Sequence, residues 1–167
     1  MSTDLSGQNL KRTNNAQINF SSDAPLEIIK AQSDKCQGIL NLENGEFAFK
    51  ILIKTFDGFN SKLQREHFYE NYMEVSQYPD ATFLGKMIEV VDFSESDDLK
   101  LRAKGNLKIH GVAKERIIEV NLRRSEDQIL FNSELEVLLN DHNIEIPNIV
   151  RQKIAEKIKI TVSGTLE

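Results

Sequence analysis

Cysteine is almost absent from this chain of 167 residues, which contains a single one at Cys36. A lone thiol cannot form a disulfide within the chain, and without a histidine nearby in the sequence it is a poor candidate for a nucleophile. We therefore interpret Cys36 as a small residue within a strand. The redox compartment of the protein is left open by this count.

Long apolar runs are also missing. No run reaches the ~18 residues that a helix needs to cross a bilayer, so no transmembrane segment is expected. Residues 1–15 are polar throughout and carry no secretory signal. Because this segment is rich in Ser, Asn, Thr and Lys and lacks periodicity, we predict a flexible N-terminal leader over 1–15, followed by one barrel domain over 16–167.

A basic excess is missing too, since the formal net charge is −5 and the isoelectric point is about 5.3. Nucleic acid is therefore not expected as a partner. The sequence has no Walker A loop, GxGxxG, HExxH or nucleophile elbow. Its histidines, His67, His110 and His142, lie far apart and lack the spacing of metal ligands. No catalytic residue, metal site or cofactor is predicted, and the protein is not expected to be an enzyme.

The sequence does contain apolar and polar residues that alternate with a period of two. The alternation is clearest over residues 99–109, where Leu, Ala, Gly and Ile alternate with Lys, Arg and Asn. It recurs over 47–53, 129–139 and 158–166, and more weakly over 18–20, 26–31, 36–42 and 81–91. Such one-sided strands predict an all-β fold, an antiparallel β-barrel of about eight strands. A β-sandwich is the competing arrangement.

One or two short helices are expected between the strands. Ser61 followed by Gln64 matches a capping box and predicts a helix over 62–73. Pro79 then directs the chain into the next strand, because the residue before a proline favours an extended conformation. Pro147 is expected to begin a second helix over 147–156.

The His-Gly dipeptide at 110–111 predicts a two-residue hairpin turn in which Ile109 faces Val112. This register points Lys114 and Arg116 toward the interior near one rim of the barrel. Both are then candidates to bind an anionic head group such as a pyrophosphate. A bulge or a longer turn would instead point both outward. The sequence leaves these two alternatives open.

The inward faces of the strands supply a predicted ligand-binding set that mixes large and small residues. Its members are Phe47, Phe49, Ile51, Ile53, Phe83, Gly85, Leu101, Ala103, Gly105, Leu107, Ile118, Val120, Phe131, Ser133, Leu135 and Ile160. Eight-stranded barrels have room for one small ligand, and small inward residues leave space for it. The alternative is that the glycines let the strands bend sharply as the barrel closes.

Two separated segments, 65–83 (REHFYENYMEVSQYPDATF) and 105–114 (GNLKIHGVAK), resemble the YceI-like family of lipocalin-like, polyisoprenoid-binding proteins. The stretch Asp-His-Asn-Ile at 141–144 adds to the resemblance, which extends from about Ala16 to the C-terminus. Family members usually have an aromatic residue where this chain has His142. That difference concerns the packing of the last loop rather than the fold.

The resemblance implies a lipocalin-like barrel that binds and carries an isoprenoid, such as an isoprenoid quinone, or a similar amphiphilic lipid. A bound isoprenoid lipid is then the one non-protein component expected. The alternative is an interaction module with a solidly packed barrel that acts through its outer loops. Many members are exported, so a periplasmic or secreted location is implied if a signal peptide was removed, and a cytoplasmic one if the chain is complete as written. The oligomeric state is left open, a dimer included.

Overall fold

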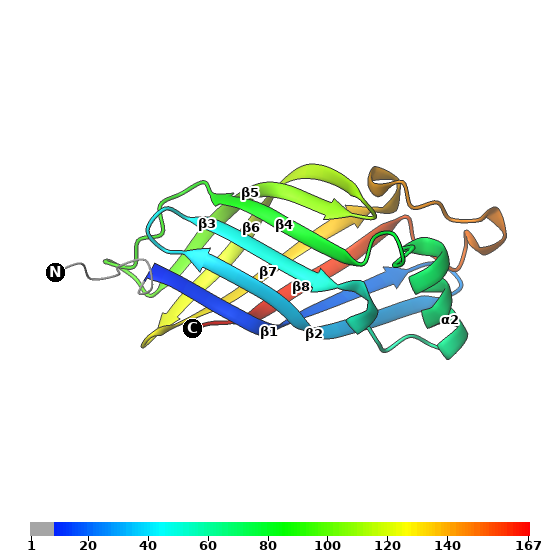
Figure 1. Ribbon diagram of the computed structural model, residues 1–167, viewed down its shortest axis with the longest axis horizontal. Coiled ribbons are helices and arrows are strands. Elements are labelled where there is room, and N and C mark those ends of the chain that lie inside the picture. The colour runs from blue at the N-terminus through cyan, green and yellow to red at the C-terminus, as the bar shows by residue number, and fades with distance from the viewer. Residues whose placement is uncertain (1–8) are drawn as a thin grey trace.

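A computed structural model describes residues 9–167, in which eight antiparallel strands form a closed barrel (Figure 1). The strands are β1 Leu10–Asp23, β2 Ile28–Asn41, β3 Glu46–Leu52, β4 Asp80–Met87, β5 Asp98–Ile109, β6 Val112–Ser125, β7 Gln128–Leu138 and β8 Lys157–Leu166. Each strand pairs with the next, and β8 pairs with β1. The all-β prediction of an eight-stranded barrel is confirmed. The sandwich is excluded because no sheet edge separates two layers.

Strand β1 begins before the predicted domain boundary, so the prediction of a leader over 1–15 is wrong from Leu10 onward. Its first residues pair with the end of β2, and Leu10 lies opposite Asn41. The backbone of Arg12 also exchanges two hydrogen bonds with Glu167, at 2.9 and 2.8 Å. The first half of β1 has polar side chains on both faces, so its sequence shows no alternation of apolar and polar residues. Residues 1–8 of the predicted leader lie outside the described residues.

The turn between β5 and β6 is the predicted two-residue turn. Ile109 faces Val112, and both turn residues have positive φ, 54° at His110 and 73° at Gly111. These are the backbone angles that hairpin turns of this length require. Pairing continues without interruption to Asp98 opposite Arg123. The bulge considered as an alternative is therefore absent from this hairpin.

The β6–β7 ladder covers only part of β6. Pairing runs from Ser125 to Val120, which lies opposite Ser133. The Ser133 hydroxyl then donates a hydrogen bond of 2.6 Å to the Glu119 carbonyl, at the end of the ladder. Beyond this point β6 pairs with β5 alone, as far as Val112.

The predicted helix over 62–73 consists of α2, Lys62–His67, and a π-helical turn, η2, Phe68–Tyr72. The Gln64 amide donates to the Ser61 hydroxyl at 3.0 Å, so the predicted cap forms. The Gln64 side chain accepts from the Asn60 amide at 2.9 Å rather than from Ser61. Two 3₁₀ turns, η1 Ile53–Thr55 and η3 Leu139–His142, follow β3 and β7.

The second predicted helix, over 147–156, is only a 3₁₀ turn, η4 Asn148–Val150. The Val150 carbonyl still accepts from the Lys153 and Ile154 amides, at 2.8 and 3.2 Å, but two later backbone groups bind outside the segment. The Gln152 carbonyl accepts from the Leu26 amide at 2.9 Å, and the Ala155 amide donates to the Ser22 hydroxyl at 2.8 Å. These bonds fix the loop to the end of β1 and to the β1–β2 turn, and the regular helix does not continue.

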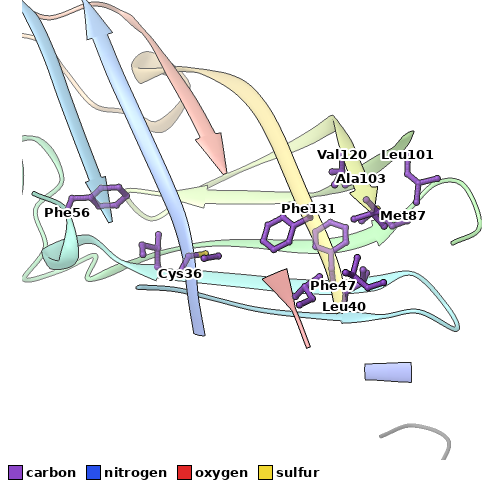
Figure 2. Close-up of a cluster of buried hydrophobic side chains, with 14 of the residues drawn as sticks. Cys36, Leu40, Phe47, Phe56, Met87, Leu101, Ala103, Val120 and Phe131 are labelled. Carbon is purple, nitrogen blue, oxygen red and sulfur yellow. The ribbon is translucent and has the colours of Figure 1, made fainter. Parts of the chain in front are cut away.

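The two ends of the barrel differ. At the end that carries the C-terminus, large apolar side chains are almost wholly buried, namely Leu40, Leu122, Ile129 and Leu166. Figure 2 shows core side chains from several strands pointing into the shared interior. At the opposite end lie α2 and the 139–156 segment, drawn in orange and brown in Figure 1. A second buried cluster, made of Ile53, Met73, Val75 and Ile144, packs beside these segments.

Candidate functional site

An apolar cavity of about 390 Å³ lies inside the barrel and is lined by residues of all eight strands. Its floor is formed by buried side chains at the closed end, such as Leu40 and Leu166. The lining reaches the other end at Phe68, Val150 and Ile154, so the opening lies between α2 and the η4 loop. A volume of this size falls within the range of about 300–1,000 Å³ that is usual for small-molecule sites.

Most of the predicted ligand-binding set lines this cavity. These residues are Phe47, Phe49, Ile51, Ile53, Phe83, Ala103, Leu107, Ile118, Val120, Phe131, Ser133, Leu135 and Ile160. The structure therefore places them around one shared space. Their assignment to ligand binding stays a prediction.

Leu101, Gly85 and Gly105 were predicted to line the cavity, but they lie outside its lining. Leu101 is buried in the hydrophobic core. The two glycines lie opposite each other in the β4–β5 ladder. A Cβ atom on Gly85 would lie 2.0 Å from the Lys104 carbonyl oxygen, and one on Gly105 would lie 2.4 Å from that of Leu84. The glycines therefore permit a close approach of two strands. The alternative, that they let the strands bend sharply, stays a prediction.

Lys114 and Arg116 were predicted as head-group ligands. The uninterrupted β5–β6 register places them opposite Leu107 and Gly105, on the face of β6 that also carries Ile118. Neither belongs to the cavity lining; Lys114 is exposed and Arg116 is half-buried. They lie in the part of β6 that has no partner on the β7 side. Their role at a head group stays a prediction.

One wall of the mouth is aromatic. The ring of Phe68 stacks on Phe20 with centroids 5.3 Å apart, and lies 5.0 Å from Phe59. Phe56 packs against Phe20 at 5.3 Å. Because these rings come from η2, β1 and the loop after η1, they attach the helical segment to the barrel and extend the apolar surface to its rim.

Polar groups gather at the opening itself. Glu27, Gln64, His67 and Lys153 all contribute to the lining there. The Glu27 carboxylate accepts hydrogen bonds from Asn60, at 3.0 Å, and from Gln64, at 2.5 Å. These two bonds lower the pKa of Glu27, with a smaller contribution from the charge of Lys153. The mouth thus combines an anion, a cation and neutral polar groups above an apolar interior.

Two titratable side chains in the lining are stabilised in their neutral forms. Burial raises the pKa of the Cys36 thiol from its ordinary 9.0 to about 11. Burial also raises the pKa of Tyr72. A neutral thiol is a weak nucleophile, so this geometry does not activate Cys36.

Two histidines connect three segments beside the mouth. The His110 ring contacts the Glu74 carboxylate through Nε2, and its Nδ1 donates to the His142 carbonyl at 2.9 Å. The buried ring of His142 donates to the Val112 carbonyl at 2.8 Å. His142 therefore fixes the last loop where an aromatic residue was expected. Within residues 9–167 no three potential metal-ligating side chains group together, and no helix is long and apolar enough to span a membrane.

The aromatic and polar residues of the mouth were not predicted. Phe56 and Phe59 lie in a loop without alternation, and Phe20 lies in a weakly patterned strand. Phe68 lies in the predicted helix, and its apolar character was the one available signal. Glu27 and Lys153 are far apart in sequence, so only the fold brings them together.

A closed antiparallel barrel around an apolar cavity with a polar mouth defines the class of ligand-enclosing β-barrels. This chain belongs to the YceI-like domain family, whose family model matches residues 11–166.

Solved structures with the same fold are distant in sequence. A polyisoprenoid-binding domain from Saccharophagus degradans, implicated in plant cell wall breakdown, has a TM-score of 0.78 at 15% identity, covering 95% of this chain and 98% of its own. BcnA of Burkholderia cenocepacia has a TM-score of 0.75 at 14% identity, covering 91% and 96%. The YCEI protein of Campylobacter jejuni has a TM-score of 0.65 at 17% identity, covering 83% and 85%. No curated protein sequence matches the chain.

Proposed function

We propose that this protein binds an isoprenoid or similar amphiphilic lipid inside its barrel and carries it through an aqueous space, without an enzymatic step. The observation that carries the proposal is an apolar cavity closed at one end and polar at its mouth. A structural relative, the Saccharophagus degradans domain, is described as polyisoprenoid-binding. Membership of the YceI-like family supports the same reading.

The physical basis is the transfer of an apolar chain out of water. Each buried methylene contributes about 0.8 kcal/mol, from which the cost of ordering a flexible chain must be subtracted. The volume of about 390 Å³ lies near the lower end of the usual range, which favours a tail of moderate length. The cavity also counts against the alternative of an interaction module, which requires a solidly packed barrel.

The head group is proposed to lie at the mouth. An amphiphile places its apolar part in the lining and keeps its polar part near water. Gln64, His67 and Lys153 supply donors at that position. Carriage through an aqueous compartment such as the periplasm is the part of the proposal that goes beyond binding.

A lipid extract of the purified protein tests binding directly. Mass spectrometry of an organic extract is expected to find an amphiphilic lipid at a fixed ratio to protein. Ile118→Phe places a larger ring in the cavity and is expected to reduce the extracted lipid by about tenfold, since each lost 1.4 kcal/mol of binding is a factor of ten.

The adjacent residue provides the matched control. Ile117 lies on the opposite face of β6 and is exposed, so Ile117→Phe is expected to leave the lipid content unchanged. Equal lipid in both variants, or a clean extract of the parent protein made in a lipid-containing cell, would contradict the proposal.

A further inference from the structure

Large apolar side chains are exposed around the cavity mouth on three separate segments. They are Leu26 in the β1–β2 turn, Leu63 on α2 and Ile149 on η4, exposed to 66%, 60% and 91%. A single exposed apolar side chain is ordinary, but a group that surrounds the opening of an apolar cavity calls for a partner.

Hydrogen bonds hold these segments next to one another. The Leu26 amide donates to the Gln152 carbonyl, three residues beyond Ile149, at 2.9 Å. The Gln64 side chain, adjacent to Leu63, donates to Glu27 at 2.5 Å. The three apolar side chains therefore lie on one rim, which we call the mouth rim and define as Leu26, Leu63 and Ile149. In Figure 1 the helix α2 and the 139–156 segment lie at this same end.

Cations accompany the mouth rim. Lys62 precedes Leu63, and Arg151 and Lys153 follow Ile149, and all three are exposed. None of them forms an ion pair with any residue from 9 to 167. Exposed Glu66 and Glu145 lie on the same segments, so the charge is mixed. Lys153 also lies close enough to Glu27, next to Leu26, to lower the pKa of that carboxyl, so within residues 9–167 Lys62 and Arg151 are the rim cations without an acidic partner.

We propose that the mouth rim docks on a lipid bilayer, with its three side chains in the headgroup region and its cations near lipid phosphates. This inference rests on the proposed function, because a lipid that enters the cavity must come from a membrane. Apolar side chains flanked by Lys and Arg are the composition that binds membrane surfaces. Docking in this orientation joins the cavity mouth to the membrane and lets a tail pass between the two without exposure to water.

Vesicle flotation tests the docking surface. The purified protein is mixed with vesicles of phosphatidylcholine, with and without phosphatidylglycerol, and the floated fraction is measured. The parent protein is expected to float with both, and better with phosphatidylglycerol at low salt, because the cations gain from anionic lipid. The triple variant Leu26→Ser, Leu63→Ser, Ile149→Ser is expected to lower the partition coefficient by at least about tenfold. Burial of even one such apolar side chain in the headgroup region increases membrane affinity by about that factor.

Three exposed apolar residues elsewhere give the matched control. The variant Leu84→Ser, Val90→Ser, Ile117→Ser removes side chains that are exposed to 52%, 80% and 54% and do not line the cavity. It is expected to float like the parent protein. Failure of the parent protein to float with either vesicle, full flotation of the mouth-rim variant, or an equal loss in the control variant overturns the proposal.

Binding of farnesol, measured by calorimetry without vesicles, keeps this test separate from the proposed function. The parent protein and the mouth-rim variant are expected to bind farnesol with the same affinity. Loss of farnesol binding in the mouth-rim variant alone would mean that these side chains form the cavity, and would overturn docking. If the parent protein itself does not bind farnesol, the proposed function is overturned, whatever the flotation shows.

Discussion

Cys36 illustrates at the residue scale how burial sets chemistry. Its thiol lines the cavity, and burial raises its pKa to about 11. A thiol with a raised pKa is neutral in the folded protein over a wider pH range than in the unfolded chain. The contribution of Cys36 to the free energy of unfolding is therefore fully present below pH 9.0. It is lost as the pH rises from 9.0 through about 11, because the unfolded chain releases the thiol proton first.

Alkylation of Cys36 by iodoacetamide is predicted to be slow at a pH below 9.0. The shift from 9.0 to about 11 lowers the thiolate fraction about a hundredfold, and burial restricts access further. Mass spectrometry over time measures the modified fraction. The same reaction in concentrated urea is the control, and equal rates in both conditions would disprove a protected thiol.

At the scale of elements, a strand was predicted well where apolar and polar residues alternate clearly in its sequence. The residue pairs of the β5–β6 hairpin were predicted correctly, because the inner face of β5 is apolar throughout and the turn contains His-Gly. The first half of β1 was missed, because Asn14 and Asn15 and their neighbours give no alternation. Its strand state comes from pairing with β2 and from the Arg12–Glu167 backbone bonds, which are tertiary and leave no local signal.

The candidate site divides in the same way. Residues of the barrel wall, such as Phe131 and Ile118, were predicted because a strand's inward face is fixed by its period of two. The mouth was not, because Glu27, Gln64 and Lys153 meet only after the β1–β2 turn, α2 and the η4 loop are packed together. Gly105 was predicted to line the cavity but lies outside its lining, because the sequence does not reveal the close approach of β4 and β5 at this residue.

Gly105→Ala is predicted to destabilise the fold rather than alter ligand content. Its new methyl group would lie 2.4 Å from the Leu84 carbonyl oxygen, so the backbone must move. We expect a loss of about 1–3 kcal/mol in the free energy of unfolding, the usual cost of overpacking. Urea denaturation measures it.

Lys104→Ala provides the control for this element, because Lys104 is the exposed neighbour on the outer face of β5. Its effect is expected to stay within about 0.5 kcal/mol. An unchanged denaturation midpoint for Gly105→Ala would show that β4 and β5 do not depend on this close approach.

At the scale of the whole molecule, the proposed ligand belongs to the core. A compound that binds only the folded state raises stability by about 2.7 kcal/mol when its free concentration is a hundredfold above its Kd. Removal of bound lipid by organic extraction and refolding is therefore predicted to lower Tm. Differential scanning calorimetry of the protein before and after extraction measures the change.

Ile118→Phe serves here as the reference, because the added ring lowers its expected lipid content about tenfold. Its Tm is expected to change much less on extraction than the Tm of the parent protein. A parent protein whose Tm does not change on extraction would contradict a ligand that fills the core.

The packed side chains of Leu40 and Leu166 close the floor of the barrel, so the proposed ligand enters and leaves through the mouth at the opposite end. A molecule that enters tail first must leave head first, and it can never be threaded from one side of the protein to the other. In the proposed carriage, the membrane that supplies the lipid and the membrane that receives it must both contact this mouth, so the protein would not act as a fixed channel between them. If the protein carries lipid as proposed, it must detach and diffuse with one bound molecule at a time, and the lipid flux would scale with its copy number.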